Sequence, residues 1–116
     1  MRDFMFLYRL PAPTANQPAE SPQQMQERMQ RWTAWFKDLE SRGVLKTLGA
    51  PLESTGALVK DKKVTITDGP FAEAKDIIGG YSIVSAENLA HANELATDCP
   101  VFKMGGFVEV RPIRQM

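Results

Sequence analysis

The fold is decided by residues 64–81, which read VTITDGPFAEAKDIIGGY. Valine and isoleucine alternate with threonine over residues 64–67, and this alternation predicts a strand. Asp68-Gly69 is a turn dipeptide, and the pair Gly79-Gly80 leads into a further strand. The stretch therefore predicts the end of one strand, a loop that contains turn-forming residues, and the start of another strand.

More strands are predicted on the N-terminal side of this stretch. Asp61-Lys62 separates two short runs rich in β-branched and apolar residues, so residues 57–67 predict a hairpin. Residues 44–52 look extended, with a glycine and a proline marking an irregular end. The apolar and aromatic run at residues 4–8 predicts a strand with two apolar faces, which requires cover on both sides.

The first predicted helix has a clear start and a periodic face. Ser21 is a capping residue, Pro22 suits the first helical position, and Gln24 stands where a capping-box partner belongs. Gly43 fits the helix end. Apolar side chains recur at spacings of three and four residues, which predicts a buried stripe. The stripe consists of Met25, Met29, Trp32, Phe36 and Leu39, widened by Trp35.

A second helix and a last strand complete the pattern. Ser85 is the predicted cap of this helix, which ends at Cys99-Pro100. Residues 107–111 predict the final strand, because aromatic and β-branched residues stand there between Gly106 and Pro112. The predicted buried residues of the helix are Leu89, Ala92, Leu95 and Ala96.

The predicted order is strand, helix, two or three strands, strand, helix, strand. This order favours an α+β fold with a ferredoxin-like βαββαβ sheet and both helices on one face. A length of 116 residues suits one domain that spans residues 1–116. The apolar side chains of the other sheet face also require cover. A second copy of the chain is the economical answer, so we expect a homodimer.

Composition argues against several functions. Lys and Arg together number 14, as do Asp and Glu, whereas proteins that bind nucleic acids usually carry a basic excess. No apolar run approaches the ~20 residues that span a bilayer, and the N-terminus reads as a strand rather than a signal peptide. Cys99 is the single cysteine, so a cysteine-based zinc site is not expected. We expect a cytoplasmic protein without metal or cofactor, which binds neither nucleic acid nor membranes.

Two segments resemble the DGPF-type branch of the YCII-related domain family. They are residues 64–81 and the ending GFVEVRPI at residues 106–113. Trp32 and Trp35 on the first helix, and Cys99-Pro100 after the second, extend the resemblance over nearly the whole chain. The resemblance implies a ferredoxin-like protomer of a dimeric α/β barrel, with a pocket between the sheet and its flanking loops.

The resemblance also implies two kinds of function. Some more distant YCII-like members act as enzymes on small molecules, including the dehydrochlorination of a hydroxylated aromatic. Other members are encoded near, or joined to, extracytoplasmic-function sigma factors, which implies a regulatory context. YCII-like members often pair a histidine of the first helix with an aspartate. Here Trp32 stands in the corresponding place and the only histidine is His91, so that acid–base pair does not carry over.

Asp68 is the candidate catalytic residue, as a general base or as an anchor for a ligand. A carboxylate with a pKa of about 3.9 is a poor base at neutral pH unless burial raises that pKa. The competing interpretation is structural, because aspartate side chains commonly accept backbone N–H groups of the turn that follows. The sequence favours this second role.

Further candidates lie on the same loop and on neighbouring elements. Glycine permits close approach of a ligand and proline stiffens a loop, although both serve the backbone shape first. Lysine offers charge to an anion, while aromatic side chains can stack on a ligand or simply fill the core. The candidate ligand-binding residues are Gly69, Pro70, Phe71, Lys75, Tyr81, Trp32 and Arg9.

Two functions stay open at this point. The first is a small-molecule-binding or enzymatic domain with its pocket beside residues 68–81. The second is a non-catalytic interaction module in a sigma-factor-linked circuit. The sequence names no ligand or reaction and leaves open whether the chain is an enzyme.

Overall fold

Four strands form one antiparallel sheet in the order β2-β5-β1-β6, and two further strands form a separate hairpin. The computed structural model describes residues 1–13, 17–68 and 75–116, with residue 68 described for its backbone only. The sheet order is that of a ferredoxin-like βαββαβ fold with a hairpin inserted after its second strand, so the predicted α+β class is confirmed. The elements are β1 (Arg2–Pro11), α1 (Pro22–Ser41), β2 (Leu45–Pro51), β3 (Thr55–Lys60), β4 (Lys63–Asp68), β5 (Asp76–Ala86), α2 (Leu89–Ala96), the 3₁₀ helix η1 (Pro100–Met104) and β6 (Phe107–Pro112).

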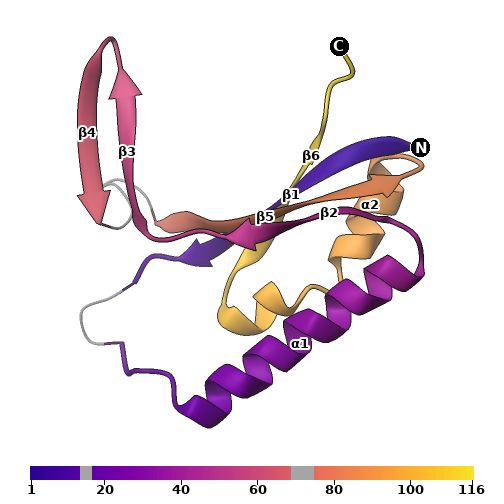
Figure 1. Ribbon diagram of the computed structural model, residues 1–116, viewed down its shortest axis with the longest axis horizontal. Coiled ribbons are helices and arrows are strands. Elements are labelled where there is room, and N and C mark those ends of the chain that lie inside the picture. Colours follow the sequence, from indigo (N-terminus) through magenta and orange to yellow (C-terminus); the bar gives the residue numbers. More distant parts are fainter. Residues whose placement is uncertain (14–16, 69–74) are drawn as a thin grey trace.

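Both helices lie on one face of the four-stranded sheet (Figure 1). Strand β1 sends alternate side chains into the layer between sheet and helices, where they are buried. This alternation places the core on one side of the sheet, as a half-buried antiparallel strand requires. The core is made by Phe4, Phe6, Tyr8, Trp35, Leu39, Val84, Leu95 and Val101, among others.

Helix α1 begins as predicted. The Ser21 hydroxyl accepts the Gln24 backbone N–H, and the Gln24 side chain accepts the Ser21 N–H in return. The predicted buried stripe is wrong at Met25 and Met29, which are 45% and 57% exposed. The helix diverges from the sheet toward its N-terminus (Figure 1), so these two side chains reach no partner layer in this chain.

The predicted start of the second helix at Ser85 is wrong. Strand β5 continues to Ala86, because Ser85 donates its N–H to the Val44 carbonyl and its hydroxyl to Asp3. Asn88 caps α2 instead, and its side chain accepts the His91 N–H at 2.8 Å. Ala92, Leu95 and Ala96 are buried as predicted, whereas Leu89 in the first turn is exposed.

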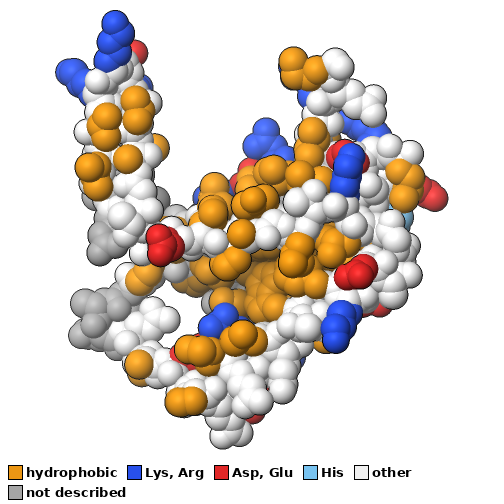
Figure 2. Space-filling view, viewed as in Figure 1, with side chains coloured by type: hydrophobic (Ala, Val, Ile, Leu, Met, Phe, Trp, Pro, Cys, Tyr) orange, Lys and Arg blue, Asp and Glu red, His pale blue; other side chains and the backbone are white. Residues whose placement is uncertain are grey.

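The hairpin of β3 and β4 forms at the predicted turn. Asp61 and Lys62 both have left-handed backbone conformations, with φ of 51° and 67°, as a tight two-residue hairpin turn requires. The register sets Val59 opposite Val64 and Ala57 opposite Ile66, so these four side chains share one face. The hairpin stands away from the sheet and helices (Figure 1), and Figure 2 shows apolar side chains along it.

The outer face of the sheet combines apolar side chains with paired charges. Register places Met5 beside Ile83 and Leu7 beside Tyr81 on this face, opposite to the core. Arg9 forms ion pairs there with Asp76 and Glu109. Arg111 and Arg9 donate hydrogen bonds that hold the pKa of the Glu109 carboxyl below its usual value.

Candidate functional site

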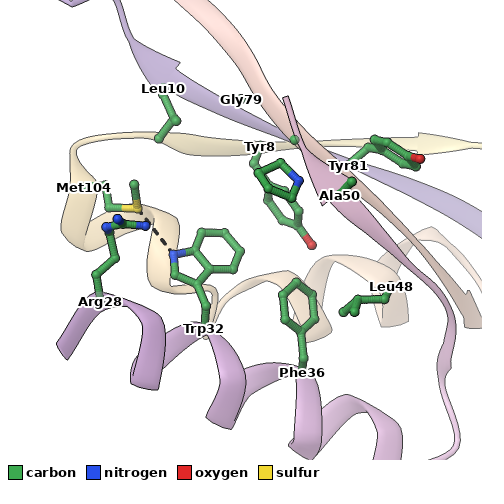
Figure 3. A pocket seen from close by; sticks show the side chains of 12 residues that line it. Tyr8, Leu10, Arg28, Trp32, Phe36, Leu48, Ala50, Gly79, Tyr81 and Met104 are labelled. Atoms are coloured by element: carbon green, nitrogen blue, oxygen red, sulfur yellow. Dashed lines mark hydrogen bonds between the residues drawn. The ribbon is translucent and has the colours of Figure 1, made fainter. Parts of the chain in front are cut away.

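A cavity of about 250 Å³ lies between α1 and the sheet, near the end of β2. Figure 2 shows hydrophobic side chains gathered in this hollow, and Figure 3 shows the side chains that line it. Most of the lining is apolar or aromatic, and among the described residues that form it Arg28 is the one cation. The lining residues are Tyr8, Leu10, Arg28, Trp32, Phe36, Leu48, Ala50, Pro51, Gly79, Gly80, Tyr81 and Met104.

Helix α1 supplies the aromatic wall, because residues four apart in a helix lie on the same face. Trp32 and Phe36 have ring centroids 5.7 Å apart, and both rings point toward the sheet (Figure 3). The Trp32 indole N–H donates to the Met104 sulfur at 3.4 Å, which fixes the ring beside η1. The wall therefore presents π-surfaces that are already held in place.

Tyr8 of β1 adds a polar group to the lining, and its ring lies edge-on against Trp32. Its hydroxyl donates to the Ser82 oxygen at 2.8 Å, and the Ser82 hydroxyl donates to the Leu48 carbonyl at 2.7 Å. Burial raises the pKa of the Tyr8 phenol well above its usual value of about 10. The phenol therefore stays neutral at physiological pH, and its oxygen retains a lone pair that can accept a hydrogen bond.

Strand β2 approaches β5 closely beside the cavity because Gly49 carries no side chain. Gly49 has a φ of +75°, and a Cβ on it would overlap the carbonyl oxygen of Tyr81. The Leu52 N–H then donates to the Gly79 carbonyl at 2.9 Å, just beyond the end of β2. These contacts set the edge of the cavity that Ala50 and Pro51 form.

The described lining suits binding by stacking and hydrogen bonding. Its ionisable side chains are Tyr8, Tyr81 and Arg28, and a guanidinium or a neutral phenol is a poor general base at neutral pH. Within residues 1–13, 17–67 and 75–116, no three His, Cys, Asp or Glu side chains gather closely enough to hold a metal ion. No helix in the described part of the chain is long and apolar enough to cross a membrane.

Comparison with known families identifies the chain. The YCII-related domain matches residues 5–116, almost the full length. The chain belongs to the YCII-related domain family. None of the curated protein sequences compared with this YCII-related domain matches it.

A solved structure shares the fold of this YCII-related domain. It is the 5-chloro-2-hydroxyhydroquinone dehydrochlorinase TftG from Burkholderia phenoliruptrix, in complex with 2,5-dihydroxybenzoquinone. The two chains are 20% identical, and the match covers 98% of this chain and 95% of that one with a TM-score of 0.50. At this level of identity the likeness shows the ferredoxin-like fold.

The structure brings two of the candidate ligand-binding residues of this YCII-related domain to the cavity. Trp32 and Tyr81 both line it. The Tyr81 hydroxyl points away from Tyr8 and Trp32 (Figure 3), as expected from a register that pairs Tyr81 with outward-facing Leu7.

The other candidates lie elsewhere. Arg9 lies on the outer face of the sheet, where it forms ion pairs with Asp76 and Glu109. Lys75 is exposed and directly precedes β5. Gly69, Pro70 and Phe71 lie outside the described residues. Asp68 ends β4, and its side chain likewise lies outside the described part of the chain.

Sequence reasoning missed most of the cavity. The sequence predicts Tyr8 only as part of a strand and gives no sign that Arg28 lines a cavity. Arg28 lies one helical turn before Trp32 and therefore on the same face of α1. Leu48 and Met104 reach the cavity from an irregular strand and a 3₁₀ helix, for which the sequence carries no periodic signal. His91 lies away from this cavity, is half-buried, and accepts the Glu87 N–H at its Nδ1 at 3.1 Å.

Proposed function

We propose that this YCII-related domain binds a small aromatic molecule in the cavity between α1 and the sheet. The observation that carries the proposal is a set of aromatic rings, held against one another, that line the cavity: Trp32 and Phe36 from α1 and Tyr8 from β1. Apolar cavities of about 150 Å³ hold a benzene ring, and pockets for drug-sized ligands start at about 300 Å³. A cavity of about 250 Å³ therefore suits a molecule of one or two rings.

The bound quinone of the dehydrochlorinase supports this size class, since it is a single substituted ring held by a protein of the same fold. We place binding before catalysis, because the described lining supplies no general base for neutral pH. Asp68 stays the candidate for any catalytic step. A DGPF-type assignment, a single domain over residues 1–116 and a cytoplasmic location are further predictions of the same proposal.

A matched pair of substitutions tests the cavity. Leu48 lines it and Leu58 lies on the hairpin, and the two side chains are similarly exposed, at 56% and 54%. We expect phenol, hydroquinone or 1-naphthol to bind the wild-type protein in calorimetric titrations. Leu48→Trp should fill the cavity and abolish binding, whereas Leu58→Trp should leave binding unchanged. Absence of binding by every compound, or equal binding by both variants, would contradict the proposal.

The homodimer is a separate proposal, and the hairpin is the observation that favours it. Val59 and Ile66 on its apolar face are 71% and 76% exposed, and an isolated two-stranded hairpin is at best marginally stable in water. We propose that a second copy of the chain covers this face together with the outer face of the sheet. The charges Arg9, Asp76 and Glu109 of that outer face already pair within the chain, so a partner meets few unpaired charges there.

A further inference from the structure

We propose that the ligand carries a carboxylate, and that Arg28, Arg31 and Lys103 bind this group at one end of the aromatic cavity. The inference rests on the proposed binding function and specifies its ligand class. The apolar ring would occupy the space beside Trp32, and the carboxylate would point toward the three cations.

A second cavity, of about 360 Å³, adjoins the aromatic one. The two share Leu10, Arg28 and Met104 in their linings. The second cavity is more polar, because Glu20, Arg31 and Lys103 also line it. Figure 3 shows the Arg28 guanidinium beside Met104, at the end of the aromatic cavity toward which Trp32 directs its indole N–H. A ligand that extends from the aromatic cavity in this direction meets the cations next.

The charges around this second cavity do not balance. Among the described residues that line it, Arg28, Arg31 and Lys103 contribute three positive charges against the single carboxylate of Glu20, whose pKa is lowered by Arg28 and by Arg31. Glu20 accepts hydrogen bonds from Nε and Nη2 of Arg28 at 3.1–3.2 Å. This leaves Nη1 of Arg28 for another acceptor, since a guanidinium has five N–H donors in a planar fork.

Arg31 is a further cation of the second cavity whose hydrogen bonds are incomplete. Its Nε is buried and has no hydrogen-bond partner among the described residues. A buried donor left unpaired is costly, and more so when it is charged. Glu27 lies one helical turn before Arg31, yet the ion pairs of the described residues do not include it. Arg31 therefore adds a positive charge to the second cavity that no ion pair of the described residues offsets.

Spacing on the helix adds to the same conclusion. Arg28 and Arg31 are three residues apart on α1 and therefore neighbours, and like charges at this spacing repel each other. A carboxylate bound between the two guanidinium groups would offset this repulsion. Arginine is well suited to this role, because its planar fork matches the two carboxylate oxygens.

Paired ligands test the inference. The probes are 1-naphthoate and 1-naphthamide, which share the ring system and differ in charge, titrated calorimetrically against the wild-type protein. We expect the carboxylate to bind about tenfold more tightly, the difference between a charge-assisted and a neutral hydrogen bond. In the Arg31→Gln, Lys103→Gln double variant, which keeps Arg28, the preference for the carboxylate should fall well below tenfold. Arg31→Lys, which keeps the charge, should keep part of the preference.

Arg42→Gln is the matched control. Arg42 follows α1 in an exposed pair with Asp38, so its loss removes one guanidinium near the same helix without touching either cavity. This variant should keep the tenfold preference. Equal binding of both probes by the wild-type protein, or an undiminished tenfold preference in the double variant, overturns the carboxylate inference and leaves the aromatic cavity standing. Failure of both probes to bind the wild-type protein overturns the inference and counts against the aromatic cavity as well.

Discussion

The Tyr8 ring meets the Trp32 indole edge-on, with centroids 4.9 Å apart and an angle of 80° between the ring planes. Trp35 packs against both rings from deeper in the core. Two tryptophans of one helix therefore have different surroundings, because Trp35 is buried whereas Trp32 keeps one edge open to the cavity. This difference separates a structural role from a binding role.

Alanine substitution should separate these roles. Trp35→Ala should lower the free energy of unfolding by about 3–5 kcal/mol, as expected when a buried aromatic side chain leaves a cavity. Trp32→Ala should cost less, about 1–2 kcal/mol, because part of its surface is already exposed. Urea unfolding measures both values, and titration with 1-naphthol should show that Trp32→Ala has lost binding. A larger stability loss for Trp32→Ala than for Trp35→Ala would contradict this division.

The chain of hydrogen bonds from Tyr8 through Ser82 to Leu48 should behave as a coupled unit. Ser82→Ala leaves the buried Tyr8 hydroxyl and the Leu48 carbonyl without their partner, at a cost of about 1–3 kcal/mol. Tyr8→Phe leaves the Ser82 to Leu48 bond intact and should cost about 0.5–1.5 kcal/mol. The double variant should cost less than the sum of the two, as measured by urea unfolding. Strict additivity would show that the two bonds are independent.

Two glycines with almost the same backbone conformation should respond differently to alanine. Gly43 and Gly49 have φ of +73° and +75°, but a Cβ on Gly43 meets nothing within 4 Å, whereas one on Gly49 overlaps the Tyr81 carbonyl. Gly43→Ala should cost about 1–2 kcal/mol from the left-handed conformation alone. Gly49→Ala should cost about 2–5 kcal/mol, because overpacking adds to that strain. Equal losses in thermal unfolding would argue against a rigid approach of β2 to β5.

Cys99 should make stability depend on pH in the alkaline range. Burial raises the pKa of its thiol to about 12, despite a hydrogen bond from the Val101 backbone that lowers it. An unfolded thiol has a pKa of about 8.5, so the folded state binds a proton that the unfolded state releases. The contribution is fully present below about pH 8.5 and is lost as pH rises toward 12.

Comparison with Cys99→Ala isolates this effect from the titration of other groups. Between pH 8 and pH 10 the wild-type protein should lose about 2 kcal/mol more than the variant, at 1.36 kcal/mol per pH unit above the unfolded pKa. The native thiol should also react slowly with iodoacetamide at pH 8, since the thiolate is the reactive form. Parallel pH profiles for the two proteins would show that the thiol titrates normally in the folded state.

Adjacent residues on β4 test the proposed homodimer. Ile66 lies on the apolar face of the hairpin and Thr65 on the opposite face. Light scattering of the wild-type protein should give twice the 13.0 kDa mass of one chain. Ile66→Lys should shift the mass to that of one chain, because a charge enters an apolar contact, whereas Thr65→Lys should leave it unchanged. A monomeric wild-type protein would refute the dimer, and a dimeric Ile66→Lys protein would remove the hairpin from the interface.

Local sequence signals account well for the elements and less well for their surroundings. The capping box at Ser21 and the turn at Asp61-Lys62 depend on residues three or fewer apart, and both were predicted. The start of α2 was misplaced because Ser85 makes its hydrogen bonds with Asp3 and Val44, which are remote in the chain. The exposure of Met25 and Met29 depends on the inclination of α1 to the sheet, which periodicity does not encode.

The sequence predicts where the cavity lies better than it predicts which residues line it. The sequence directed attention to the loop at residues 68–81, and the cavity does include Gly79, Gly80 and Tyr81. Its other aromatic rings and its cation come instead from β1 and α1, which meet only in the fold and contribute Tyr8, Trp32 and Arg28. Arg31 shows the same limit, because nothing in a sequence reveals that a particular guanidinium nitrogen is buried without a partner.

The hydrogen bond from the Leu52 N–H to the Gly79 carbonyl joins the residue that follows β2 to strand β5. The segment that carries the hairpin therefore leaves β2 beside β5, the strand into which the chain later leads. Insertions or deletions in the hairpin would leave the register of the four-stranded sheet intact, because the hydrogen bond between Leu52 and Gly79 lies outside the hairpin and longer loops cost little. The hairpin can therefore change in length, in surface residues and in partner without a change in the cavity between α1 and the sheet.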